Sequence, residues 1–152
     1  MRIAPVVLVA FVVAGCGGNQ DPKDPNAALE KMFHEFSDGA ASGDWDKTCS
    51  RVTREYVYLS KVALRDAGAE PPNDCAGVMA FAAEHTPRLQ AQLADEYEDA
   101  RFDGAEVTGS TARVDYSVFL DGEFTTHERQ AMTAYARRDD DGRWKITRIT
   151  SA

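Results

Sequence analysis

Three histidines, His34, His85 and His127, are the side chains of this chain best suited to move protons near neutral pH. His34 lies beside Glu35 on the polar side of a helical pattern, so we expect it to be solvated. His85 lies at the end of another helical pattern, where its positive form can cap free carbonyl groups. Neither position suits a general base, which leaves His127.

The orientation of His127 depends on the turn that precedes it. If Asp121-Gly122 forms the two-residue loop that tight hairpins prefer, Val118 pairs with Thr125 and Tyr116 pairs with His127. Directly opposed residues share a face of the sheet. His127 is then the candidate general base, oriented by Tyr116, whereas a loop longer by one residue would turn it to solvent. The expected cavity-lining face consists of Val114, Tyr116, Val118, Leu120 and His127.

Other patterns that carry chemistry are absent. The acidic runs at residues 95–99 and 139–141 lack the ligand spacing of a calcium loop and are typical of solvated surface. The chain contains no Gly-x-Ser-x-Gly, no phosphate-binding loop and no His-Glu-x-x-His. We therefore expect no cofactor and no metal.

Cys16 closes the sequence Val13-Ala14-Gly15-Cys16. Residues 3–13 are almost entirely apolar, and they are too few to span a bilayer core, which needs about 20. A short apolar run that ends in small residues is typical of a signal peptide. Its last four residues resemble the lipobox of bacterial lipoproteins, which implies cleavage before Cys16 and lipidation of its thiol. The alternative is an ordinary secretory peptide that leaves Cys16 as a free thiol.

The lipoprotein resemblance implies a chain held by lipid on the extracytoplasmic face of the cell membrane. Cleavage removes residues 1–15 and leaves 137 of the 152 residues: a lipidated Cys with a flexible tether at 16–26, and a single domain at 27–152. Without Arg2 the chain has 16 basic and 25 acidic residues, a formal charge of −9. Such a charge disfavours nucleic acid and anionic headgroups, so the lipid must supply the membrane attachment.

Helical periodicity fills the first part of the domain. The clearest helix is capped by Asp24, has Pro25 in its first turn and ends near Gly43. Asp44 can cap a second helix that runs to about residue 51. A third helical pattern follows it, and a fourth helix opens at Asn73 or Asp74. The first helix has a buried face of Leu29, Met32, Phe33, Phe36 and Ala40, and the third pattern, ending at Gly68, carries Val52, Tyr56, Leu59, Val62 and Ala63.

The period changes in the second part of the domain. Residues 101–107, 113–120, 124–137 and 144–149 read as strands, with the clearest alternation in the second. Helices followed by an antiparallel meander predict an α+β fold, with helices packed on one face of a curved antiparallel sheet of about four strands.

This order of elements resembles the cystatin-like α+β cone proteins named for nuclear transport factor two, and among them small secreted lipoproteins. The resemblance rests on the helix corner Ser42-Gly43-Asp44-Trp45, the first hairpin at residues 105–114 and the closing hairpin with Gly142-Arg143-Trp144-Lys145-Ile146. It implies a cone whose cavity binds a small apolar ligand, or a sheet that docks an envelope protein or a second copy, without catalysis. The alternative is a small isomerase or dehydratase that uses the cavity, although the carboxylate pair of such enzymes has no counterpart here.

The resemblance also bears on Cys49 and Cys75. In the resembling lipoproteins the two corresponding helices are neighbours, and thiols outside the cytoplasm oxidise. We therefore expect a structural disulfide between Cys49 and Cys75, with two free thiols as the alternative.

Lipidation at Cys16 is directly testable. Replacing Cys16 with Ser removes the thiol that accepts the lipid, so the variant should accumulate as an unprocessed or soluble product. Membrane fractionation and gel mobility measure this. A variant that fractionates and migrates like the unaltered chain would refute the lipoprotein interpretation.

Overall fold

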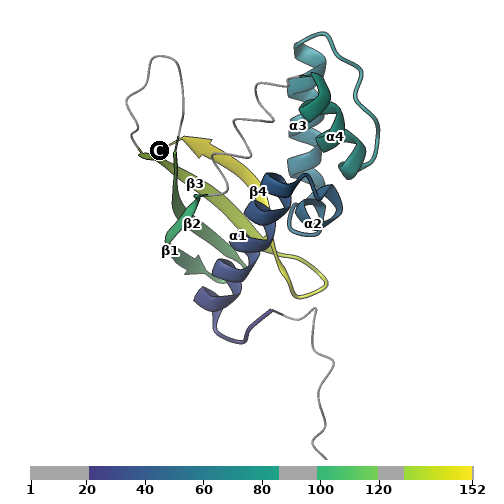
Figure 1. The fold of residues 1–152 in the computed structure, drawn as a ribbon. Coiled ribbons are helices and arrows are strands. Elements are labelled where there is room, and N and C mark those ends of the chain that lie inside the picture. Colours follow the sequence, from purple (N-terminus) through teal and green to yellow (C-terminus); the bar gives the residue numbers. More distant parts are fainter. Residues whose placement is uncertain (1–20, 86–98, 120–128, 152) are drawn as a thin grey trace, which may run out of the picture.

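The computed structural model describes residues 21–85, 99–119 and 129–151, and within them helices pack against one face of an antiparallel sheet (Figure 1). The predicted α+β fold class is confirmed. The helices are α1 (Pro25–Ser42), α2 (Trp45–Cys49), α3 (Arg54–Asp66) and α4 (Cys75–His85). The strands are β1 (Arg101–Thr108), β2 (Thr111–Phe119), β3 (Arg129–Arg138) and β4 (Trp144–Ser151).

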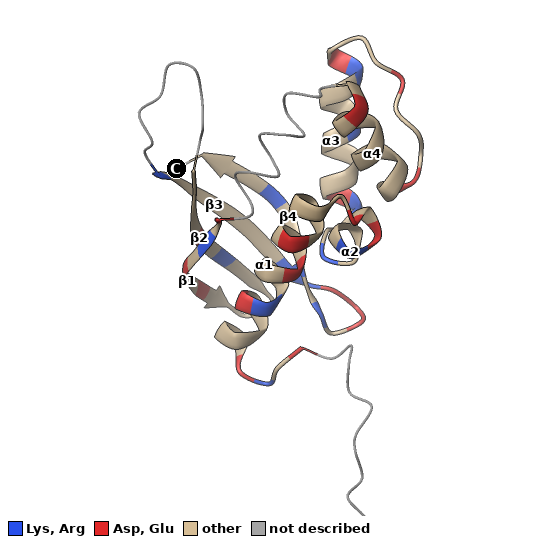
Figure 2. Cartoon of the chain, viewed as in Figure 1, with Lys and Arg blue, Asp and Glu red and all other residues tan. Residues whose placement is uncertain are grey.

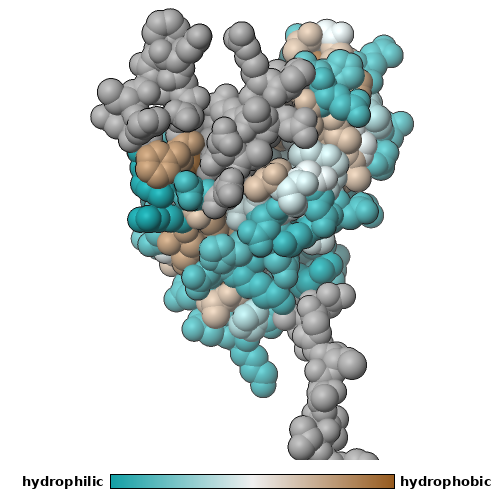
Figure 3. All heavy atoms as spheres, viewed as in Figure 1, coloured by the Kyte–Doolittle hydropathy of each residue, from teal (hydrophilic) through white to brown (hydrophobic). Residues whose placement is uncertain are grey.

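Helix α1 begins and ends where its capping residues predict. The Asp24 carboxylate accepts a hydrogen bond from the Asn26 backbone N–H at 2.9 Å, and Pro25 occupies the first turn. Gly43 ends the helix with φ of +72°, a conformation that costs glycine nothing. The expected apolar face is buried, while the surface over α1 is largely hydrophilic (Figure 3). The buried apolar face consists of Ala28, Leu29, Met32, Phe33, Phe36 and Ala40.

The strands form a meander in the order β1-β2-β3-β4. Alternate residues of β2 and β3 point toward α1 and form one hydrophobic core with β4, because side chains of a strand alternate between the two faces. The sheet contributes to that core Ala112, Val114, Tyr116, Val118, Ala134, Ala136, Trp144 and Ile146.

The predicted register between β2 and β3 is wrong. Tyr116 pairs with Met132 and Val118 with Gln130, in place of His127 and Thr125. The last described pair joins Phe119 to Arg129, and the Asp121-Gly122 turn lies outside the described residues. The predicted register would have turned Tyr135 and its odd-numbered neighbours toward the helices, whereas the observed one buries Ala134 and Ala136. Burial therefore decides the register against the local turn preference, and Leu120 and His127 lie outside the described residues.

The domain also begins earlier than the expected tether boundary. Asp21 lies within the stretch predicted to be flexible, yet its side chain is only 3% exposed, because it forms a two-point ion pair with the buried Arg51 guanidinium. Asp21 also accepts the Trp144 backbone N–H at 2.9 Å. A second carboxylate, Glu35 of α1, accepts from Nε of Arg51. The residues from Asp21 onward therefore belong to the packed domain.

Arg51 is held in its charged form by these partners. Burial alone would lower its pKa, but the hydrogen bonds and charges of Asp21 and Glu35 outweigh it and raise the pKa. Backbone hydrogen bonds also join this segment to β4. The Ile146 N–H donates to the Arg51 carbonyl at 2.8 Å, and the Thr53 N–H donates to the Ile146 carbonyl at 2.9 Å. Val52, which we expected in a helix, instead forms a parallel bridge with Ile146, and α3 begins after it.

The Cys49–Cys75 disulfide is confirmed and joins the end of α2 to the start of α4. It closes a loop over a sequence separation of 26, which in the chain-entropy model stabilises the fold by about 3 to 4 kcal/mol. The bridge ties the α3/α4 pair, which stands beside the edge strand β4 in Figure 1, to the helices that cover the sheet. No helix among the described residues is long and apolar enough to cross a membrane.

Candidate binding site

The inner face of the sheet, where sequence analysis placed a cavity, is packed at the residues that the structure describes. Val114, Tyr116 and Val118 share this face as expected and are 0%, 1% and 3% exposed. The Tyr116 ring lies 4.9 Å from that of Phe33 on α1, centroid to centroid. These three residues are core members, and none of them lines either of the pockets described below.

Two phenols are the titratable groups nearest this core. Tyr56 of α3 packs edge-on against Phe36, with ring centroids 6.2 Å apart. Burial, and to a smaller degree the neighbouring Tyr116, raises the pKa of Tyr56 to about 12. A phenol with such a pKa stays protonated at neutral pH and acts as a hydrogen-bond donor, not as a base. Within the described chain, no carboxylate or imidazole belongs to this hydrophobic cluster.

The two histidines that the structure describes lie on the surface. His34 is half exposed and its Nε2 lies 3.9 Å from Glu30, as a solvated helix residue would. The His85 ring stacks on Phe81 at 3.7 Å between centroids, and its Nδ1 hydrogen-bonds the Phe81 carbonyl at 2.9 Å. His85 therefore contacts a carbonyl in the last turns of α4.

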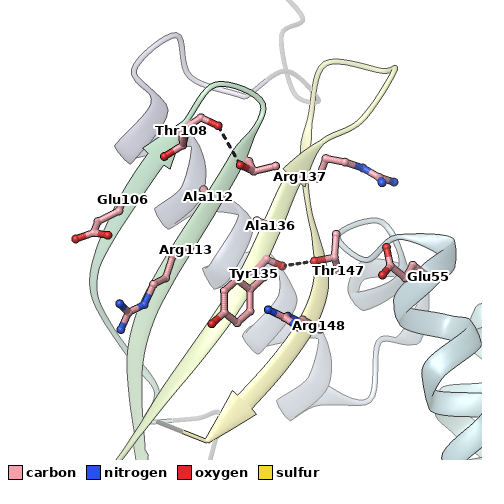
Figure 4. Close-up of a pocket in the computed structure, with 11 residues that line it drawn as sticks. Glu55, Glu106, Thr108, Ala112, Arg113, Tyr135, Ala136, Arg137, Thr147 and Arg148 are labelled. Atoms are coloured by element: carbon pink, nitrogen blue, oxygen red, sulfur yellow. Dashed lines mark hydrogen bonds between the residues drawn. The ribbon is translucent and has the colours of Figure 1, made fainter.

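The outer face of the sheet, away from α1, holds an open pocket of about 470 Å³ (Figure 4). One row of directly paired residues crosses all four strands there: Glu106 of β1, Arg113 of β2, Tyr135 of β3 and Arg148 of β4. Figure 4 shows the Tyr135 ring between the side chains of Arg113 and Arg148. Cross-strand neighbours of this kind lie about 5 Å apart, so their groups act on one ligand.

The arginines of this pocket differ in how far they are neutralised. Arg113 pairs with Asp115 at 3.1 Å, and Arg148 stacks its guanidinium 4.0 Å from the Tyr135 ring centroid. Arg137, which lies two residues after Tyr135 on β3, also lines the pocket. Two carboxylates, Glu55 and Glu106, line the same pocket, but within the described part of the chain neither Arg137 nor Arg148 forms an ion pair.

Sequence reasoning missed this row because it assigned one face of each strand to a cavity and left the other face unexamined. The sequence did contain a sign of this row, because Arg113 and Asp115 on one strand, and Tyr135 and Arg137 on another, are spaced two residues apart and so share a face. Only the correct register brings Arg113, Tyr135 and Arg148 into one line. The bulge at Thr147, whose hydroxyl donates to the Tyr135 carbonyl at 3.0 Å, was not predictable from turn residues.

No protein-family model matches the sequence, and no curated protein matches it. Solved structures do resemble it. A Shewanella frigidimarina protein named "putative ketosteroid isomerase" aligns over 80% of this chain and 92% of its own, with a TM-score of 0.52 and 16% identity. An NTF2-like protein with a cystatin-like fold from Novosphingobium aromaticivorans covers 80% of this chain and 77% of its own, with a TM-score of 0.46 and 22% identity.

A third structure, a "putative dehydratase from the NTF2-like family" of Streptomyces avermitilis, covers 80% of this chain and 90% of its own, with a TM-score of 0.40 and 20% identity. Helices packed on a four-stranded antiparallel sheet are what the predicted fold class requires, and the Shewanella structure shares this fold. At these identities the likeness concerns the fold alone.

The raised pKa of Tyr56 predicts a specific loss of stability in alkali. The unfolded chain releases the Tyr56 proton near pH 10, while the folded chain keeps it to about pH 12. Stability is therefore full below pH 10 and falls between pH 10 and 12, by about 1.4 kcal/mol per unit from this group. Urea unfolding of the unaltered chain and of Tyr56→Phe across this range measures it. Equal alkaline losses in the two proteins would contradict the assignment.

Proposed function

We propose that the chain is a lipid-anchored, extracytoplasmic interaction protein that binds an acidic segment of another envelope protein through the outer face of its sheet. The signal-like residues 1–15 and Cys16 support the anchor. The single observation that carries the binding role is the outer pocket, where three arginines outnumber two glutamates and where, among the described residues, Arg137 and Arg148 form no ion pair.

Charge supports this choice of partner. The whole chain has a formal charge of −8, whereas the three arginines and two glutamates that line the pocket give it a formal charge of 3 − 2 = +1. Figure 2 shows basic segments on the strands and on the helices, and acidic segments on the helices, the turns and β1. Arg148 keeps its guanidinium edge open while its face rests on Tyr135, which fits two-point recognition of a carboxylate.

The packed inner face supports binding over catalysis. None of the fully buried polar residues in the described chain is an Asp, Glu or His, and the shielded Asp21 side chain is paired with Arg51. The protonated Tyr56 and the adjacent Tyr116 favour one second candidate, an isomerase or dehydratase in which these phenols donate hydrogen bonds to a substrate oxygen. The names of the Shewanella and Streptomyces neighbours are compatible with that candidate.

A peptide of ten glutamates is a suitable probe for the outer pocket. The unaltered chain should bind it, more weakly as salt rises, and Arg137→Ala/Arg148→Ala should lower the affinity at least about tenfold. Arg138→Ala is the matched control, because Arg138 is exposed and also lies over an aromatic ring, that of Trp144, but does not line the pocket. Isothermal titration calorimetry measures all three.

Two results would overturn this proposal. One is a failure to discriminate: either the peptide does not bind at all, or Arg138→Ala lowers its affinity as much as Arg137→Ala/Arg148→Ala does. The other is a stable dimer in sedimentation that Arg137→Ala/Arg148→Ala dissociates, which would assign the face to a second copy of the chain. Conversion of a ketosteroid or hydroxyacid substrate, lost in Tyr116→Phe, would favour the second candidate.

A further inference from the structure

A second pocket, of about 440 Å³, lies between α3, the end of α2 and the segment that leads into α4. Its lining includes Val52, Val57 and both cysteines of the disulfide. Val52 is a member of the hydrophobic core, and Val57 and Cys75 pack against that core. The floor of this groove, which we call the disulfide groove, is therefore apolar and continuous with the interior.

Helix α3 leaves apolar surface uncovered beside this groove. None of its 13 residues is buried, although an amphipathic helix ordinarily buries an apolar stripe. Two of the three large exposed hydrophobic side chains in the described chain lie on it, Tyr58 at 63% and Leu59 at 47% exposure. Tyr58 lines the disulfide groove and Leu59 does not. The groove thus has an aromatic wall that the protein itself does not cover.

The charges at the groove are all of one sign. Arg54 and Lys61 line it, and their spacing with Val57 and Tyr58 puts all four on one side of α3. Lys61 donates to the neutral Asn73 side chain at 2.7 Å, and none of the residues that line the groove is acidic. An apolar floor between two cations is complementary to a ligand with an apolar body and an anionic head.

We propose that the disulfide groove binds an anionic single-chain amphiphile, a long-chain carboxylate. The alkyl chain lies on Val52, Val57 and the disulfide and against Tyr58, where its methylenes are removed from water. The carboxylate is held by Lys61 and Arg54 at the rim. This site is separate from the outer sheet pocket, which shares none of its lining residues.

Titration calorimetry with decanoate below its critical micelle concentration tests the proposal on the whole protein. Tyr58→Ala and Lys61→Met should each weaken decanoate binding at least fivefold. Leu59→Ala and Arg65→Met are matched controls, since both residues are exposed on the same helix and neither lines the groove, and they should stay within twofold. Decyltrimethylammonium, with the same chain and the opposite charge, should not bind.

The outcomes that overturn it are equally definite. Absence of decanoate binding would refute the proposal. Equal binding of decyltrimethylammonium would also refute it, because it would show burial of the alkyl chain without recognition of the carboxylate. Equal losses in Leu59→Ala and Tyr58→Ala would show binding elsewhere on α3. Melting curves of the four variants identify any loss of affinity that comes from unfolding.

Discussion

The buried guanidinium of Arg51 is the constraint on which the rest of this structure depends. Arg51 is 1% exposed, and a charge removed from water so completely destabilises a protein by several kcal/mol unless it is paired. Its partners come from two separate places, Asp21 before α1 and Glu35 within α1. The same Asp21 carboxylate also binds the backbone N–H of Trp144 at the start of β4. One cation therefore fixes the entry of the chain, the first helix and the edge strand relative to one another.

Both candidate sites follow from that arrangement. Because the Arg51 and Thr53 backbones pair with Ile146, the edge of β4 is held against the segment that opens α3. Val52, between them, becomes the floor of the disulfide groove. On the outer face of the sheet, Tyr135 and Arg148 line the open pocket described above. The proposed surface recognition rests on these two pockets.

Local signals in the sequence predicted the elements well. Asp24, Pro25 and Gly43 fixed α1 to the residue, because capping depends only on near neighbours in the chain. The alternation of β2 identified Val114, Tyr116 and Val118 as one inward face. The lipoprotein resemblance led to the Cys49–Cys75 bridge.

The same reasoning failed where residues that lie far apart in the sequence pair with each other. Asp121-Gly122 suggested a register that burial of Ala134 and Ala136 overrode. Asp21 stands in a polar, proline-containing stretch typical of a tether, and its partner Arg51 lies 30 residues away, so no local pattern marks it as buried. The outer row was missed for the same reason, since Arg113, Tyr135 and Arg148 become neighbours only across strands.

A double-mutant cycle on Asp21 and Arg51 tests the central role of this ion pair most directly. The free energies of unfolding of Asp21→Asn, Arg51→Met and the double variant are measured in urea against the unaltered chain. We expect Arg51→Met to destabilise by about 3 to 5 kcal/mol, because it leaves the buried Asp21 carboxylate without its cation. The double variant should be less destabilised than the sum of the single changes by at least about 1 kcal/mol. Additivity within about 0.5 kcal/mol would show that the two residues do not interact and would contradict the account.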